Sequence, residues 1–167
     1  MPSPKILVIG IGNPLRGDDG VGQGVIKALR ADVQSCFVKY RDVFQLLPEH
    51  AADLAEVSHV IFVDACVEGR PGTVTRHKFQ SVLQAPTRAI GHHLSPDWLL
   101  WACQSWYGRS PEAVLYTVSG CDFDHQESLS PPVISAVPVA THLIKQELQS
   151  LLSQQSQYTG LNVHRDA

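Results

Sequence analysis

Short apolar runs alternate with segments of helical periodicity along the chain, and this alternation restricts the fold more than any other feature. Four runs rich in β-branched, aromatic or other apolar residues predict strands, at about 5–9, 36–40, 59–64 and 113–118. Helices are predicted in four other segments, at about 18–31, 45–57, 94–107 and from 130 onward. Continuous apolar strands separated by helices are typical of a parallel sheet covered on both faces. We therefore predict an α/β fold with three layers, a twisted, mostly parallel sheet of about five strands between helices.

The fifth strand is predicted at 72–79, where residues alternate after a Pro-Gly turn, as in an edge strand. The 167 residues suffice for one domain, since about 100–200 residues per domain is usual. We predict that residues 1–152 form this domain. Residues 153–167 are polar and nearly free of large apolar side chains, so we expect a disordered tail there.

The composition excludes several classes of partner and site. The net charge is −3 and the charges are interspersed, so the chain has no basic stripe and nucleic acid is not an expected partner. No apolar run approaches the ~18 residues of a membrane span, and the apolar segment at residue 6 leaves no room for a signal peptide. We expect a cytoplasmic protein without membrane insertion. The four cysteines form no C-x-x-C pair, which excludes zinc ribbons and thioredoxin-like redox motifs.

A glycine-rich loop follows the first predicted strand, from Gly12 to Gly20. It does not fit a dinucleotide site, because Gly17 comes two positions late for G-x-G-x-x-G and two carboxylates would face the pyrophosphate. No Gly-Lys-Ser/Thr occurs, which excludes a P-loop. Asp18 and Asp19 are ordinary residues for a helix start, but only one of the two can be the cap. The loop therefore suits a cation better than a phosphate.

Two further polar groups follow predicted strands or precede helices. Asp64 ends a buried strand, where a carboxylate needs hydrogen bonds from a turn, a charged partner or a metal. His92 and His93 precede a helix, either as a solvated pair or with one imidazole facing the same crevice. Carboxylates and an imidazole from separate strand–helix junctions would make an open three-ligand site for a borderline metal.

Other catalytic arrangements have less support. The sequence contains neither H-E-x-x-H nor G-x-S-x-G, the motifs of zinc proteases and serine hydrolases. Cys66, two residues after Asp64, is a possible nucleophile with His92 as its base, or else a core thiol.

Several segments carry a resemblance to a known family. The opening from Ile6 to Gly22, including Gly-Asn-Pro-Leu-Arg-Gly-Asp-Asp-Gly, resembles the start of the hydrogenase maturation proteases. These endopeptidases trim the large subunit of nickel–iron hydrogenases. Three later segments fit the same family, namely Val60–Ala65 followed by Gly72-Thr73, His92-His93-Leu94 followed by Leu99-Leu100, and Pro131-Pro132-Val133. The resemblance spans about residues 5–150.

The resemblance implies an activity and a partner. The substrate would be the [NiFe]-hydrogenase large-subunit precursor, already loaded with nickel, and the reaction would remove its C-terminal extension. The nickel would come with the precursor and would not be held tightly by the protease. The family's metal-contacting positions fall on Asp19, Asp64 and His92, with His93 as the fallback.

The same resemblance leaves the chemistry open. The first metal contact in the family is Glu or Asp, and Asp19 is the shorter of these. Asp19 or Asp64 would be the catalytic general base or a metal contact, and nickel would be catalytic or only a recognition element. Further substrate contacts would be Gly12, Asn13, Asp18 and His93. The alternatives are a nickel-sensing chaperone without proteolytic activity and a Cys–His hydrolase that uses Cys66.

Overall fold

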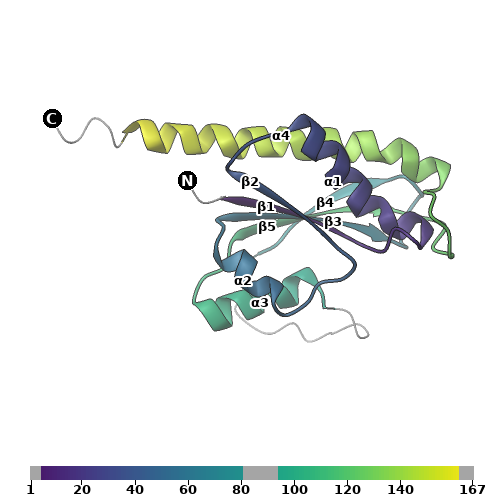
Figure 1. Ribbon diagram of the computed structural model, residues 1–167, viewed down its shortest axis with the longest axis horizontal. Helices are drawn as coiled ribbons and strands as arrows, with labels where there is room; N and C mark the ends of the chain where they lie inside the picture. The colour runs from purple at the N-terminus through teal and green to yellow at the C-terminus, as the bar shows by residue number, and fades with distance from the viewer. Residues whose placement is uncertain (1–4, 81–93, 162–167) are drawn as a thin grey trace.

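The computed structural model describes residues 5–80 and 94–161, with side chains to residue 154. Its strands are β1 (Ile6–Ile11), β2 (Val38–Val43), β3 (His59–Cys66), β4 (Val74–Lys78) and β5 (Glu112–Ser119). Its helices are the 3-10 turn η1 (Gly17–Gly20), α1 (Val21–Asp32), α2 (His50–Ala55), α3 (Pro96–Tyr107) and α4 (Pro131–Leu161). Figure 1 shows the sheet between the helices.

The five strands form one sheet in the order β2-β1-β3-β5-β4. The strands β2, β1, β3 and β5 are parallel to one another. Val8 pairs with both Tyr40 and Ile61, and Ile61 pairs with Val114. The edge strand β4 runs antiparallel to β5. The predicted α/β fold, with a mostly parallel five-stranded sheet between helices, is therefore confirmed.

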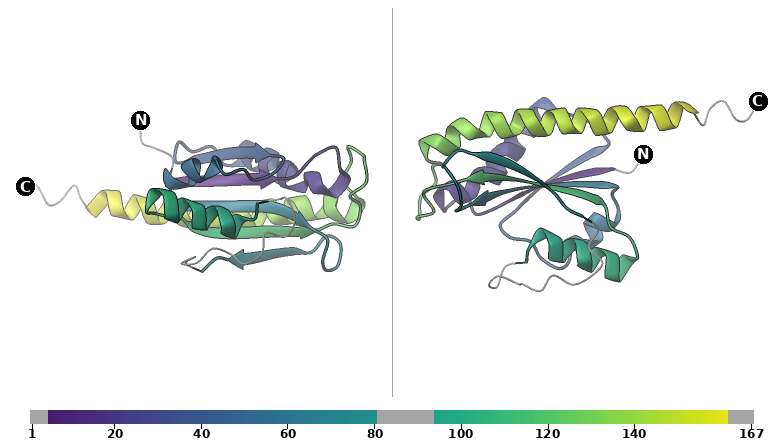
Figure 2. Two further views of the ribbon diagram at one scale, coloured as in Figure 1. Left: turned by 90° about the horizontal axis from the view of Figure 1, so that it is seen from below. Right: turned by 180° about the vertical axis from the view of Figure 1, so that it is seen from behind.

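Each face of the sheet is covered by two helices, as the right view in Figure 2 shows. The helices α1 and α4 pack on one face over side chains such as Val8, Ile61 and Val114. The helices α2 and α3 pack on the other face over Leu7, Ile9 and Phe62, among others. The alternation of Leu7, Val8 and Ile9 between the two cores explains why β1 is apolar at every position.

The helix α1 lies unusually close to the strands beneath it because of a glycine. A Cβ at Gly22 would lie 2.5 Å from the carbonyl oxygen of Ile11 and 2.6 Å from that of Val63. Any larger residue would push α1 off the sheet. Gly22 therefore seats the start of α1, and the turn η1 before it, against the ends of β1 and β3.

The long helix α4 is tied to the edge strand by a polar cluster. Arg76 of β4 donates to Glu147 from Nη2 at 2.6 Å and from Nε at 3.0 Å, and the Tyr116 hydroxyl also donates to Glu147. Burial raises the pKa of Tyr116, and its bond to the Glu147 carboxylate raises it further. The cluster holds the antiparallel edge of the sheet against α4.

Three predicted boundaries need correction. The helix α1 begins at Val21 after η1, and neither Asp18 nor Asp19 caps it. The helix predicted at 45–57 is shorter, because Pro48 disfavours a helical residue before it. Residues 153–161, predicted as a disordered tail, continue α4, since no glycine or proline interrupts them before Gly160. Residues 162–167 of that predicted tail lie outside the described residues.

Among the described helices, none combines the length and hydropathy needed to cross a membrane.

Candidate active site

The topology creates a crevice at the edge where the parallel strands end, called here the carboxyl edge. The chain leaves β1 toward β2 on one side and later crosses to β3 on the other side. Loops that diverge in this way from neighbouring strands leave the crevice where α/β proteins bind ligands. Asp19 lies in η1 after β1, and Asp64 lies near the end of β3, so both flank this crevice.

The loop after β1 folds back onto η1 and fixes Asp19. Gly12 has a φ of 130°, and a Cβ there would lie 1.8 Å from the carbonyl oxygen of Asp19, so only glycine fits. The backbone N–H of Asn13 donates to Asp19 Oδ2 at 2.7 Å. Gln23 of α1 donates to the Gly12 carbonyl at 2.9 Å. The carboxylate of Asp19 is therefore held in place by the loop that carries it.

Asp64 is short of hydrogen-bond donors. Its Oδ1 accepts one bond, from the backbone N–H of Ala65 at 2.9 Å. No residue in the described part of the chain donates to its Oδ2. Burial raises the pKa of Asp64 to about 7, the Ala65 amide opposes this rise, and the negative charge of Asp19 adds to it. The two carboxylates therefore interact in a single site.

Two interacting carboxylates, one of them short of donors, can do two kinds of chemistry. A carboxyl group with a pKa near neutrality can accept and return a proton at physiological pH. The same pair can also bind a cation, whose charge would relieve the repulsion between the carboxylates. Both possibilities place the reacting group between Asp19 and Asp64.

Asp18, one residue from Asp19, has the opposite environment. Its buried carboxylate accepts bonds from the backbone N–H groups of Cys121, Asp122 and Ser130 at 2.8, 3.0 and 2.7 Å. The Ser130 hydroxyl donates a fourth bond at 2.8 Å. Burial alone would raise the pKa of Asp18, but these bonds outweigh it and lower the pKa. Asp18 joins η1 to the β5–α4 loop, and in this position it is neither the predicted cap nor free to contact a substrate.

The polar groups of Gly12 and Asn13 also serve the loop itself. The N–H of Gly12 donates to the Val43 carbonyl at 2.9 Å. Asn13 Oδ1 accepts a bond from the Leu15 N–H at 2.9 Å. These contacts give both residues a role in shaping the loop, and their role as substrate contacts stays a prediction.

His92 and His93 lie outside the described residues. Leu94, which follows them, bridges to Leu46 just beyond the end of β2. Within the described residues, no group of three His, Cys, Asp or Glu side chains is placed to hold a metal. The three-ligand site predicted from Asp19, Asp64 and His92 is therefore not tested, and His93 stays its alternative.

Cys66 and the end of β5 complete the edge. The Cys66 thiol lies 3.5 Å from the Ser119 hydroxyl and donates to the Glu68 carbonyl at 3.4 Å. Cys66 is half-buried, and none of its contacts among the described residues is a base. Sequence reasoning missed the residues of the β5–α4 loop that bind Asp18, because they lie 103 to 112 positions away without a local motif.

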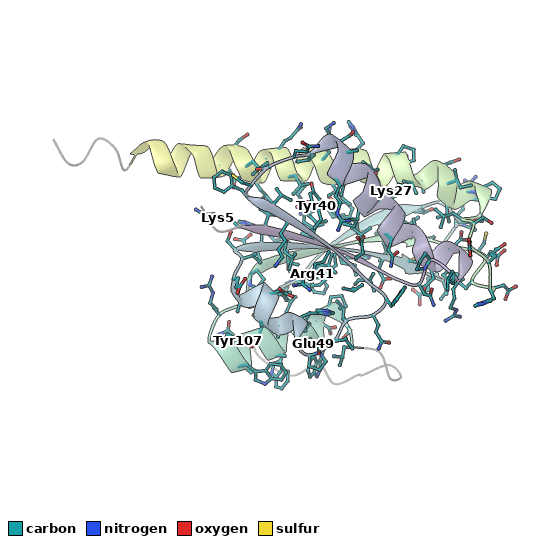
Figure 3. All side chains as sticks on the ribbon, viewed as in Figure 1. Lys5, Lys27, Tyr40, Arg41, Glu49 and Tyr107 are labelled. Carbon is teal, nitrogen blue, oxygen red and sulfur yellow. The ribbon has the colours of Figure 1, made fainter. Side chains whose placement is uncertain are left out.

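A groove lies along α1, beside the loop that carries Asp19. It has a volume of about 490 Å³, starts at Pro14 and Gly20, and passes Lys27 and Arg30, with Leu129 on its wall. Lys27 projects on the α1 side of the sheet in Figure 3. The groove thus begins at the loop that holds Asp19.

The fold and the coupled carboxylates define an α/β protein with an acidic site at its topological switch point. The chain is similar in structure to several hydrogenase maturation proteases. The hydrogenase maturating endopeptidase HybD from E. coli is 26% identical, with a TM-score of 0.73 over 87% of this chain and 93% of that chain. A hydrogenase 2 maturation peptidase from Thaumarchaeota archaeon SCGC_AB-539-E09 is also 26% identical, with a TM-score of 0.65 over 86% and 97% of the two chains.

The [NiFe] hydrogenase maturation protease HycI from Thermococcus kodakarensis KOD1 shares the fold at 23% identity, with a TM-score of 0.70 over 87% of this chain and 92% of that chain. No family model and no curated protein matches the sequence. The resemblance to hydrogenase maturation proteases that the sequence predicted is confirmed by these solved structures.

Proposed function

We propose that this chain is a hydrogenase maturation endopeptidase that removes the C-terminal extension of a nickel-loaded [NiFe]-hydrogenase large-subunit precursor. The observation that carries the proposal is the placement of two carboxylates at the switch point, Asp19 between β1 and α1 and Asp64 near the end of β3. The fold of this chain is shared with two solved maturation peptidases, each 26% identical to it.

In the proposed reaction, water attacks the scissile carbonyl and a carboxylate accepts and then donates the proton. Asp64 Oδ2 has no donor among the described residues and is the atom we assign to take the proton from the attacking water. Asp64 then returns that proton to the leaving amine as the general acid. The precursor's nickel is part of the substrate, and we assign Asp19, Asp64 and His92 as the side chains that contact it. The extension is proposed to enter along the groove beside α1.

The test follows the mass of the precursor. Purified protein is mixed with nickel-loaded and with nickel-free large-subunit precursor, and both are analysed by mass spectrometry. We expect the nickel-loaded precursor to lose its C-terminal extension and the nickel-free precursor to stay intact. A precursor that binds but keeps its full mass would contradict the proposal and identify a nickel-sensing chaperone.

Replacing Cys66 distinguishes water attack from a cysteine hydrolase. Cys66→Ser keeps the size of the side chain and its contacts with Ser119 and Glu68. We expect it to cleave at nearly the wild-type rate. Loss of cleavage by a folded Cys66→Ser protein would favour the Cys–His hydrolase.

Two histidine variants decide the third metal contact. We expect His92→Ala to abolish cleavage and His93→Ala to keep most of it. The reverse result would move the assignment to His93.

The four cysteines are unpaired, which supports a reducing compartment, and we propose that the reaction takes place in the cytoplasm.

A further inference from the structure

Three large apolar side chains are exposed in the loops at the carboxyl edge. Phe44 is 67% exposed after β2, Leu15 is 45% exposed after β1, and Val67 is 75% exposed after β3. These strands are neighbours in the sheet. What distinguishes these three from other exposed apolar residues is that they gather at one edge of the sheet, and a gathering of exposed apolar side chains can mark a binding surface.

Hydrogen bonds or a short stretch of chain connect each of these loops to the candidate active site. Val43, next to Phe44, accepts the Gly12 N–H at 2.9 Å. The Leu15 N–H donates to Asn13, whose own N–H holds Asp19. On the other side, Val67 is three residues beyond Asp64, and the Cys66 carbonyl before it accepts the Gly120 N–H at 2.8 Å.

Asp19 lies between β1 and α1, and Asp64 lies near the end of β3, so both are beside the loops that bear the apolar side chains. Since β1 lies between β2 and β3, the loops that bear Phe44 and Val67 are separated by about two strand spacings, roughly 10 Å. Leu15 lies in the loop between them. An apolar rim around a polar centre is the arrangement in which docking excludes water from the charged groups.

We propose that Leu15, Phe44 and Val67, called here the apolar rim, are the surface on which the folded body of the precursor docks. The inference rests on the proposed function and adds the interaction surface to it. The occupant is a protein surface, because the rim spans three separate loops and not a single groove. A second copy of this chain on the rim would cover Asp19 and Asp64, which a protease must leave open to its substrate.

The test compares a rim variant with a matched control. Phe44→Ser and Val67→Ser are combined in one protein, and Tyr107→Ser is the control. Tyr107 is 49% exposed at the end of α3 and lies on the side of Lys5, away from the carboxyl edge (Figure 3). All three substitutions affect exposed side chains, so thermal unfolding should change little.

Cleavage of the nickel-loaded large-subunit precursor is measured over a range of precursor concentrations. We expect the rim variant to raise KM at least tenfold while the rate at saturation falls less than threefold. The Tyr107→Ser protein should match the wild type. An unchanged KM for the rim variant would overturn the inference and leave the proposed function intact.

A binding measurement tests the apolar rim independently of whether the protein cleaves the precursor. Calorimetric titration of the same precursor is carried out with Asp64→Asn protein, with and without the two rim substitutions. At least tenfold weaker binding with the substitutions supports the rim even if the wild type cleaves nothing. Equal binding by both proteins overturns the rim. Precursor-independent dimerisation that the rim substitutions abolish would instead assign the rim to a second copy and would also overturn the inference.

Discussion

Asp18 and Asp64 are carboxylates at the same edge of the sheet, yet their hydrogen bonding differs and their pKa values shift in opposite directions. Asp18 is fully buried and receives four hydrogen bonds from the β5–α4 loop, and these lower its pKa despite the burial. Asp64 receives one bond, from its own neighbour Ala65, and burial with the nearby charge of Asp19 raises its pKa to about 7.

The difference separates structural groups from reactive ones at this edge. A buried carboxylate that accepts four hydrogen bonds from its own protein is stable as an anion and is closed to a substrate. A carboxylate with a free oxygen in a poorly solvated site remains reactive and costs stability. The neighbours Asp18 and Asp19 therefore have different roles, since Asp18 fixes the β5–α4 loop and Asp19 flanks the crevice.

The largest expected effect is the loss of precursor cleavage when either crevice carboxylate, Asp19 or Asp64, is replaced. Asp19→Asn and Asp64→Asn should each lower the rate of precursor cleavage at least about 100-fold, the usual range for a positioned general base. Both proteins should fold, because Asn keeps an oxygen to accept the N–H of Asn13 or of Ala65. Folding is checked by circular dichroism. Full activity in either folded variant would remove that residue from the site.

Next in size is the effect of Asp18 on stability. Asp18→Ala leaves the N–H groups of Cys121, Asp122 and Ser130 without their acceptor in a buried place. We expect a loss of about 3–5 kcal/mol in the free energy of unfolding, measured by urea denaturation. A loss below about 1 kcal/mol would show that the β5–α4 loop does not depend on this carboxylate.

A smaller effect is expected from Asp64 on stability, and it depends on pH. The pKa of Asp64 is about 7 in the folded protein and about 3.8 in the unfolded chain, so only the folded state holds the proton between these values. Stability from this group therefore falls as pH rises from about 4 to 7. Asp64→Asn should be more stable than wild type by about 1–3 kcal/mol at pH 8 and nearly equal to it at pH 4. A variant that is less stable at pH 8 would contradict the poor solvation of Asp64.

The smallest effect is expected at the end of α4. Its contacts with the core extend to Leu151 and Leu152, and Ser153 and Gln154 are exposed. A protein that ends at Gln154 should keep its cleavage rate and lose less than about 0.5 kcal/mol of stability. Insolubility of the shortened protein would show that the far part of α4 packs against something or recognises substrate.

Local patterns were enough to predict the architecture of this chain. The apolar runs of β1 and β3 and the stripe of α4 are short-range signals, and parallel pairing follows from their alternation with helices. The positions of Asp19 and Asp64 at the carboxyl edge follow from the same logic, because Asp19 lies between β1 and α1 and Asp64 lies near the end of β3.

The rest depends on contacts between distant parts of the chain. Asp18 and Asp19 look alike in sequence, and only the β5–α4 loop, more than 100 residues away, shows that Asp18 is buried. The apolar rim was missed for a similar reason. Leu15, Phe44 and Val67 lie far apart in sequence and become neighbours only through the order β2-β1-β3.

The titration of the aspartates by carbon-13 NMR tests most directly whether Asp19 and Asp64 share one site while Asp18 belongs to the scaffold. The account predicts that Asp64 titrates near pH 7 and that Asp18 titrates below 3.8. In Asp19→Asn protein the pKa of Asp64 should fall, because a neighbouring negative charge has been removed. A pKa for Asp64 near 3.8, or one that Asp19→Asn leaves unchanged, would contradict it.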